Sequence, residues 1–373
     1  TKAMLRESQE AHPPFGDYLA TPPERVMRLH RTSGTTGRAV NIAISEADAA
    51  EFRAVGGRAY RCGGLGPGHR AIHCLNYMLW VGGFTDHLSV EASGATVIPF
   101  GVGHSELLIR TIRETGVTVL LCTVSYPAVL ERVLAERFPG LAPKDLGLEI
   151  AILTGEAGLE SPAFRARVEG TWGFKARNLY GVSDIATVIS AECPRQHDMH
   201  FIVPDFLYRE FIDPDTGAPV PFEEGAVGEL VLTSLARECQ PLVRFRTNDI
   251  ARVTGTGACA CGRTAPRFRL VGRADDMVVV RGVNVFPSAV ATVIERIPEL
   301  SGEFRIVLKG PPPYDRLPVE AELKDGEAPS ERLAESVARA IKDVVRATPA
   351  VTLVPPYSLP RTADKPRRLI RQP

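Results

Sequence analysis

The sequence predicts an α/β protein with two domains: a large N-terminal α/β domain that carries a distorted β subdomain, and a small C-terminal α+β domain. Up to residue 181, apolar stretches with strand-like patterning alternate with stretches of helical spacing, which is typical of a mainly parallel sheet. From residue 200 the apolar runs become short and are separated by Gly and Pro, as in a β subdomain. A length of 373 residues also favours two domains.

The first half of the chain supplies the elements of the predicted parallel sheet. Residues 1–30 are rich in Pro and charge and are expected to form an extended leading segment. Short apolar runs at 26–30 and 40–45 flank a loop of small hydroxylated residues. The second run alternates and is expected to form a strand, and a helix is expected at 46–62. The alternation continues with a helix after 69–84, strands at 95–100, 117–123, 148–155 and 175–181, and helices at 107–114 and after Ser161.

The second half of the chain is expected to form the β subdomain and the small lobe. Strand-like runs occupy 206–213, 228–235, 242–254 and 267–273. The small lobe is expected to contain helices at 288–297 and 330–347 and strands at 304–308, 318–323 and 350–354.

Composition excludes several classes of protein. The 44 basic and 44 acidic residues balance, which argues against a general binder of nucleic acid or of membrane surfaces. No stretch approaches the roughly 20 apolar residues of a membrane span, and we expect no signal peptide at the start of the chain. The seven cysteines, an odd number, indicate a reducing compartment, the cytoplasm, with thiols or metal ligands in place of a disulfide framework.

Nine short motifs follow one another in the order known from one enzyme superfamily. On these motifs the chain resembles the phenylacetate–CoA ligase branch of the adenylate-forming enzymes, which include acyl-CoA synthetases and adenylation domains. The resemblance covers nearly the whole chain, and we expect the family's extreme N-terminal segment to be absent ahead of Thr1. The motifs are SGTTGR (33–38), GGF (82–84) with His87, CTVSY (122–126), GEA (155–157), NLYGVSDIA (178–186), FRTNDIA (245–251), CACGRT (259–264), GRADDMVVVRGVNVFPS (272–288) and SLPRTADKPRR (358–368).

The resemblance implies a two-step ligase. A carboxylic acid, with an aromatic acid favoured, would react with ATP to give acyl-AMP and pyrophosphate, and the acyl group would then pass to the thiol of CoA. The implied cofactors are ATP or AMP, Mg²⁺ and CoA. The implied domains are residues 1–271 and 277–373, with the second mobile about a hinge at 272–276.

The loop SGTTGR is the expected phosphate site. Its backbone N–H groups and hydroxyls can bind the β- and γ-phosphates, and its glycines allow a close approach. Its spacing differs from that of the common P-loop. The residues that would bind phosphate are Ser33, Gly34, Thr35, Thr36 and Gly37, followed by Arg38 where the family usually has Lys.

Two further motifs should bind the rest of the nucleotide and the metal. In NLYGVSDIA the resemblance implies that Tyr180, beside Gly181, stacks on adenine and that Asp184 binds Mg²⁺. Asp184 stands where the family usually has Glu, and its side chain is one methylene shorter. Gly155 and Glu156 match a segment that borders adenine, with Ala157 in place of the family's Pro.

The ribose and the hinge fall on later motifs. Asp249 matches the acid that accepts both ribose hydroxyls, a task that suits a carboxylate with two acceptor oxygens. Arg246 is either its salt-bridge partner or a phosphate ligand. Arg273 matches an arginine near the ribose and phosphate, and Asp275 falls on the hinge position, where a residue absorbs a large backbone change.

Lys365 matches the catalytic lysine of the small lobe. Its ammonium would meet the carboxylate oxygen and the α-phosphate during adenylation. Asp364 precedes it where the family usually has Gly. Together with Thr36 and Asp184, Lys365 makes up the expected catalytic set.

Three cysteines and a histidine are candidate zinc ligands. The knuckle Cys259-Ala-Cys261 combines with Cys193 and His200, and three Cys with one His is a common structural zinc set. His197 is a competing imidazole, and plain buried thiols are the alternative. The other cysteines are expected to be small buried hydrophobes: Cys62, Cys74, Cys122 and Cys239.

Aromatic side chains are expected to line the acyl pocket, because flat walls suit a flat aryl acid. Thr85 and Asp86 would add polar groups nearby. The same aromatics would also serve as core residues. They are Tyr77, Trp80, Phe84, His87 and Tyr126.

Three other functions are alternatives to the CoA ligase. One keeps the adenylation but passes the acyl group to a carrier-protein thiol or an amine. A second is a degenerate relative that binds nucleotide or acyl ligand without turnover, suggested by Arg38, Asp184 and Asp364. A third, a zinc-ribbon nucleic-acid binder, conflicts with the neutral charge and the single CxC. A homodimer is one assembly that the sequence leaves open.

Overall fold

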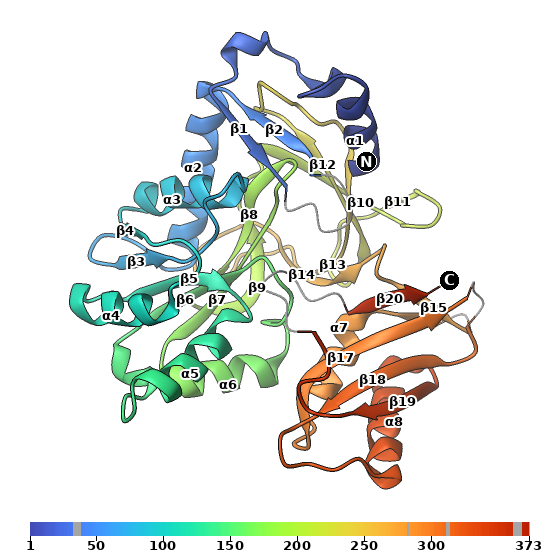
Figure 1. The fold of residues 1–373 in the computed structure, drawn as a ribbon. Helices are drawn as coiled ribbons and strands as arrows, with labels where there is room; N and C mark the ends of the chain where they lie inside the picture. Colours follow the sequence, from blue (N-terminus) through green and yellow to red (C-terminus); the bar gives the residue numbers. More distant parts are fainter. Residues whose placement is uncertain (33–38, 282, 311–313, 361–367, 373) are drawn as a thin grey trace. The chain divides into compact units, whose positions relative to one another are not determined.

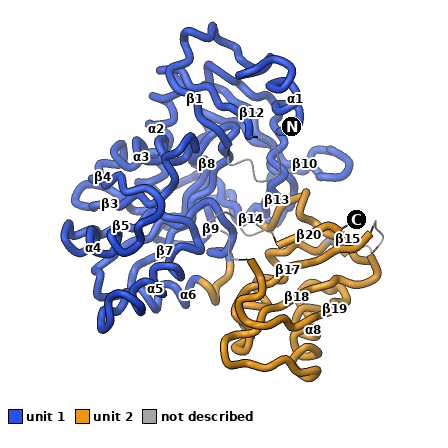
Figure 2. The backbone as a smooth tube through the Cα atoms, viewed as in Figure 1, with its two compact units in different colours: residues 1–160, 165–270 blue, residues 161–164, 271–373 orange. Residues whose placement is uncertain are grey.

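A computed structural model describes the chain except for residues 33–38, 282, 311–313, 361–367 and 373. The chain is drawn from blue to red in Figure 1. It divides into two compact units, residues 1–160 with 165–270 and residues 271–373 with 161–164 (Figure 2). Each unit is described by itself below. The hinge assigned to residues 272–276 stays a prediction.

The start of the chain is a helix, and the expected extended segment is therefore wrong. The helix α1 (Lys2–Ala11) begins after Thr1, whose side chain accepts a hydrogen bond from the backbone N–H of Met4. Leu5 and Gln9, one helical turn apart, are buried on one face. The sequence obscured this helix because most of its other positions are polar or charged. Two short 3₁₀ turns, Gly16–Tyr18 and Pro23–Arg25, follow.

A two-stranded antiparallel sheet and a long helix come next. The strands β1 (Arg28–Arg31) and β2 (Asn41–Ile44) pair with each other, and residues 33–38 lie between them in the sequence. The helix α2 (Glu46–Cys62) begins at a capping box in which Ser45 and Asp48 exchange hydrogen bonds.

The expected parallel sheet is present. Its strand order is β4-β3-β5-β6-β7, and each neighbouring pair is parallel. The strands and helices of this half are β3 (Arg70–His73), α3 (Val81–Ser93), β4 (Thr96–Pro99), α4 (Ser105–Thr115), β5 (Val119–Thr123), α5 (Tyr126–Arg137), the 3₁₀ turn Pro143–Leu146, β6 (Ile150–Thr154), α6 (Pro162–Trp172) and β7 (Lys175–Val182).

The sheet continues from β7 in the order β8-β9-β14-β13-β12-β10-β11, which forms the β subdomain. The pairs β7-β8, β8-β9, β9-β14, β13-β12, β12-β10 and β10-β11 are antiparallel. The strand β9 pairs with β14, so residues 202–266 form an insertion between two neighbouring strands. These strands are β8 (Ala186–Cys193), β9 (Gln196–Phe201), β10 (Leu207–Ile212), β11 (Pro219–Val220), β12 (Val227–Ser234), β13 (Phe245–Gly255) and β14 (Arg267–Arg273).

The core of this unit lies where α2 and α3 pack against each other and against β8. Fully buried apolar side chains from helix and sheet meet there, including Tyr60 and Ile189. Burial of such side chains supplies the main driving force for folding. Cys62, Cys74, Cys122 and Cys239 are all buried, as expected.

The second unit is an α+β lobe. A four-stranded sheet with the order β19-β18-β17-β20 packs against α7 and α8 around its own apolar core. Its elements are β15 (Val278–Val280), β16 (Val283–Val285), α7 (Pro287–Ile294), β17 (Leu300–Lys309), β18 (Leu317–Leu323), α8 (Glu331–Val345), β19 (Pro349–Val354) and β20 (Leu369–Gln372). Within the described residues, no helix has the length and apolar content needed to cross a membrane.

Candidate active site

The structure brings together two residues expected to bind the nucleoside. The phenol of Tyr180, near the end of β7, donates a 2.6 Å hydrogen bond to Oδ2 of Asp249 on β13. Tyr180 is largely buried, and its ring meets Phe268 edge-on at 6.1 Å. The backbone N–H of Asp249 also donates a 3.0 Å hydrogen bond to the hydroxyl of Thr247. The pair is therefore held from three strands of one sheet.

Glycine is required beside Tyr180. A Cβ at Gly181 would lie 1.8 Å from the backbone oxygen of Thr187 on the neighbouring strand β8. The register between the two strands shifts between Tyr180 and Val182, which marks a bulge. The close approach of the backbones fixes the position from which the Tyr180 side chain leaves the sheet.

The segment expected to border adenine follows β6. Gly155 has a φ of +83°, a conformation that glycine adopts without strain. The Glu156 carboxylate accepts hydrogen bonds from the backbone N–H of Ser125 at 2.9 Å and from its hydroxyl at 3.2 Å. Glu156 therefore ties the loop after β6 to the start of α5.

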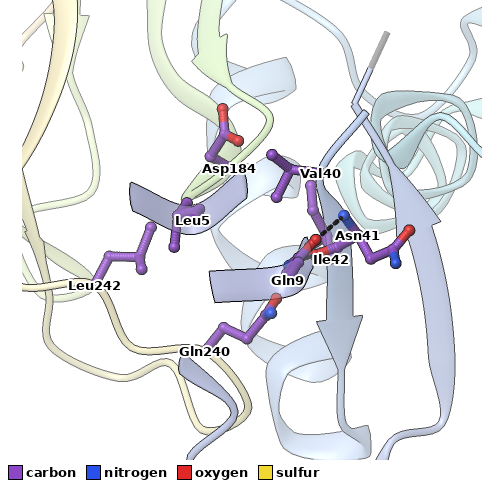
Figure 3. A pocket seen from close by; sticks show the side chains of 8 residues that line it. All are labelled: Leu5, Gln9, Val40, Asn41, Ile42, Asp184, Gln240 and Leu242. Atoms are coloured by element: carbon purple, nitrogen blue, oxygen red, sulfur yellow. Dashed lines mark hydrogen bonds between the residues drawn. The ribbon is translucent and has the colours of Figure 1, made fainter. Parts of the chain in front are cut away.

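Asp184 is buried and lies beside two cations. Its Oδ2 atom is 3.0 Å from Nζ of Lys2 on α1, while its backbone oxygen accepts a 2.7 Å bond from the buried guanidinium of Arg237. Its Oδ1 atom is buried and has no hydrogen-bond partner among the described residues. An orphaned carboxylate oxygen fits a divalent cation, because Mg²⁺ prefers such ligands. A small pocket adjoins it, drawn in Figure 3 and lined by Leu5, Gln9, Val40, Asn41, Ile42, Asp184, Gln240 and Leu242.

Several expected site residues fall elsewhere. Ser33, Gly34, Thr35, Thr36, Gly37 and Arg38, together with Asp364 and Lys365, lie outside the described residues. Arg273 and Asp275 form a two-point ion pair with distances of 2.9 and 3.0 Å. The structure describes an ion pair between Arg246 and Glu229 on β12, and not the pair with Asp249 that the sequence suggested. Arg246 therefore helps to hold β12 and β13 together.

Three of the five expected pocket aromatics form one cluster. The hydroxyl of Tyr77 is 3.1 Å from Nδ1 of His87, whose Nε2 is 3.2 Å from the Glu91 carboxylate. Phe84 stacks on His87, with ring planes 5° apart and centroids 6.0 Å apart. Burial raises the pKa of Tyr77 above its ordinary value.

The other two pocket aromatics have separate partners. Trp80 precedes α3, and its ring lies over Gly82, where a Cβ would come within 2.7 Å of it. The hydroxyl of Tyr126 is 2.9 Å from that of Ser105. Burial raises the pKa of Tyr126 to about 12. Thr85 bonds to the backbone of its own helix, and Asp86 is buried, which raises the pKa of its carboxyl.

The four candidate zinc ligands converge. The ligand atoms of Cys193, His200, Cys259 and Cys261 all lie within 4.8 Å of one another. His200 is oriented by a contact of 3.2 Å between its Nδ1 and the carbonyl of Ala265, the kind of outer contact that fixes a ligating imidazole. Burial raises the pKa of the Cys261 thiol, but hydrogen bonds from Arg263 and the neighbouring thiols lower it to about 7. Thiolate is the form that binds metal.

Sequence reasoning missed Lys2 and Arg237, which contact Asp184. Lys2 is 182 positions from Asp184, and Arg237 is 53 positions from it. Neither lies in one of the quoted motifs, and local patterning carries no signal for contacts of such range. Arg237 stands beside Glu238 and near Gln240, so the neighbouring residues do not mark it as buried.

Comparison with protein families gives two matches. Residues 3–235 match the AMP-binding enzyme family, and residues 282–372 match the AMP-binding enzyme C-terminal domain. Among individual proteins, the chain is 36% identical to the phenylacetate-coenzyme A ligase of Thermus thermophilus, over 96% of this chain and 83% of that one. It is 31% identical to the phenylacetate-coenzyme A ligase of Escherichia coli, over 99% of this chain and 83% of that one.

Solved structures give a similar result. A 2-hydroxyisobutyryl-CoA ligase in its postadenylation state, in complex with 2-HIB-AMP, is 30% identical and matches with a TM-score of 0.89. The match covers 100% of this chain and 79% of that one. The same enzyme with 2-HIB-AMP and CoA in its thioesterification state is 31% identical, with a TM-score of 0.68 over 99% of this chain and 79% of that one.

Proposed function

The chain belongs to the AMP-binding enzyme family, and on that premise we propose that it is an AMP-forming acid–thiol ligase that makes an acyl-CoA from a carboxylic acid, ATP and CoA. The observation that carries the proposal is the convergence of Tyr180 and Asp249, because the family's nucleoside-binding residues fall on these two positions and they touch at 2.6 Å. The relatives named above, CoA ligases along nearly the whole chain, support the same reaction.

The first step joins the acid to AMP. A carboxylate oxygen of the acid attacks the α-phosphorus of ATP, the bond from that phosphorus to the bridging oxygen breaks, and pyrophosphate leaves. We assign Asp249 to the ribose hydroxyls, Tyr180 to adenine, and the loop Ser33–Arg38 to the departing phosphates. Lys365 would neutralise the charge that develops at the α-phosphate. Asp184 would hold Mg²⁺, which supplies further neutralisation of phosphate charge when bound.

The second step transfers the acyl group. The sulfur of CoA attacks the acyl carbon, the bond from that carbon to the phosphate oxygen of AMP breaks, and the thiol proton is released. Two ordered steps need two arrangements of residues, which is the reason for a hinge at Asp275. A carrier-protein thiol or an amine would follow the same bond changes and is tested as the alternative acceptor.

We assign an aromatic acid as the favoured substrate, because Tyr77, Phe84 and His87 form a cluster of flat rings at the expected acyl pocket. The phenylacetate-coenzyme A ligases act on an aryl acid by name, whereas the solved 2-hydroxyisobutyryl-CoA ligase acts on a small hydroxy acid. A test of substrate preference should therefore compare aryl acids with small hydroxy acids.

The structural zinc site is a proposal of its own. Cys193, Cys259 and Cys261 with His200 offer a tetrahedral set of the usual type. The ion would join the ends of β8 and β9 to the loop before β14, and would take no part in acyl transfer. Cysteines kept as thiols suit a reducing compartment, and we infer the cytoplasm. A homodimer stays a prediction.

The test is pyrophosphate release with ATP, Mg²⁺ and a panel of acids, followed by CoA dependence of the product. We expect release with aryl acids such as phenylacetate to exceed that with 2-hydroxyisobutyrate, and acyl-CoA to form only when CoA is added. Release that is the same without any acid would overturn the proposal. Release with an acid but product only with an amine or a carrier protein would move the chain to the alternative acceptor.

A further inference from the structure

The ion pair between Lys2 and Asp184 has a role that the proposed reaction leaves unassigned. The ammonium of Lys2 is 3.0 Å from Oδ2 of Asp184, and the exposed fractions of the two side chains are 33% and 5%. A buried carboxylate needs a partner of opposite charge, because an unpaired buried charge is strongly unfavourable. The lysine is thus the side chain that neutralises the acid expected to bind the metal.

Helix α1 is fastened so that Lys2 stays in place. The amide of Gln9 forms two reciprocal hydrogen bonds with the backbone of Asn41, each 2.8 Å long (Figure 3). Leu5 lies between Lys2 and Gln9 along the helix and is buried, as Gln9 is. Asn41 is the first residue of β2, so α1 braces the strand that follows the SGTTGR loop in the sequence.

Arg237 does a different job. Its guanidinium donates to the backbone oxygens of Asp184, Ile185 and Ala43, and within the described part of the chain no side-chain hydrogen bond joins it to the Asp184 carboxylate. It holds the turn between β7 and β8 against β2. Arg237 therefore contacts the backbone of Asp184, whereas Lys2 contacts its side-chain atom Oδ2.

This arrangement leaves one oxygen of Asp184. Because Lys2 engages Oδ2, the carboxylate is held in one orientation, and Oδ1 has no partner among the described residues. A carboxylate in this state can give a cation one oxygen at a fixed place.

We propose that Lys2 is a positioning residue of the adenylation site, which fixes Asp184 through Oδ2 so that Oδ1 binds the divalent cation that accompanies ATP. The proposal rests on the proposed function.

The test is calorimetric binding of a non-hydrolysable ATP analogue to the full chain, with Mg²⁺ and with EDTA. We expect Lys2→Met to weaken binding at least about tenfold with Mg²⁺, the size of one lost bond to a charged group, and much less with EDTA. Lys2→Arg keeps the charge and should restore most of the affinity. Lys144→Met, in the 3₁₀ turn 143–146 and outside the pocket, is the matched control and should bind normally.

A second variant separates positioning from loss of the helix. Gln9→Ala loosens α1 while it keeps Lys2, and it should weaken binding by less than about threefold. Equal losses for Gln9→Ala and Lys2→Met, or equal losses with and without Mg²⁺, would assign the effect to docking of α1 and overturn the proposal. Unchanged or tighter binding by a folded Lys2→Met would also overturn it. A wild-type chain that binds no analogue would instead contradict the proposed function.

Discussion

The hydrogen bond between Tyr180 and Asp249 joins residues 69 positions apart and leads to the first prediction. Asp249→Ala should weaken ATP binding strongly, because two ribose hydroxyls lose their charged acceptor, at roughly 1.5–3 kcal/mol for each bond. Calorimetry with ATP measures it. Tyr180→Phe, which removes the phenol donor but keeps the acid and the ring, serves as the matched variant and should lose less. Full ATP affinity in Asp249→Ala would remove Asp249 from the ribose site.

A second residue-level prediction concerns His73, at the end of β3. Its imidazole is completely buried, and neither ring nitrogen has a hydrogen-bond partner among the described residues. Burial, reinforced by the nearby His87, lowers its pKa to about 3. Between pH 6.5 and 3 the unfolded chain therefore binds the proton more readily, so His73 destabilises the fold as pH falls through this range, by up to about 1.4 kcal/mol per pH unit.

The measurement is urea unfolding of wild type and His73→Leu from pH 7.5 to pH 5. We expect the wild type to lose stability more steeply than the variant below pH 6.5. The exposed His104 provides the control: His104→Asn, which suits the positive φ of that position, should leave the slope unchanged. Parallel slopes for wild type and His73→Leu would show that folding does not lower the pKa of His73.

At the scale of helices and strands, prediction succeeded where the signal was local. The helix α2 has the predicted bounds, because Ser45 and Asp48 form a capping box and the helix ends before Gly63. The helix α1 was missed because its identity rests on contacts with residues far along the chain, such as Gln9 with Asn41. The candidate nucleoside-binding residues could be identified from motifs, whereas the contact of Lys2 with Asp184 could be recognised only in the folded structure.

The zinc site belongs to this scale because it would join strand ends. Cys261→Ser should lower bound zinc from about one ion per chain and reduce thermal stability, since metal binding and folding are coupled. Each kcal/mol lost lowers Tm by about 2–4 °C in a domain of this size. Metal analysis and calorimetric melting measure both effects. The control is Cys122→Ala, which removes a buried thiol outside the cluster and should keep the metal. A folded wild type that contains no zinc would mean that the four residues are plain thiols and an imidazole.

At the scale of the whole molecule, the proposed two-step reaction would use the two units in different steps. If the small lobe supplies Lys365 to adenylation alone, Lys365→Ala should slow pyrophosphate formation on the order of 10²–10³-fold. The variant should still convert preformed acyl-AMP and CoA to thioester at near wild-type rate. Two assays on one variant test this. Equal losses of rate in both assays would mean that Lys365 has a structural role. No loss in either assay would mean that Lys365, next to Asp364, takes no part in adenylation.

The fold class could be predicted at this scale because the alternation of strands and helices and the order of motifs are properties of the linear sequence. The pairing of β9 with β14 could not, since it depends on which distant strands meet. The phosphate loop and Lys365 fall on residues 33–38 and 361–367, so their predicted roles rest on the motifs alone.

The pairing of β9 with β14 also bears on how the chain is made. During synthesis, β9 leaves the ribosome long before β14, and the whole insertion of residues 202–266 must be translated before the two can meet. Until then β9 exposes an unpaired backbone edge that favours association with other chains. We therefore expect nascent chains that stop within the insertion to aggregate, and chaperones to be needed most during that interval of translation.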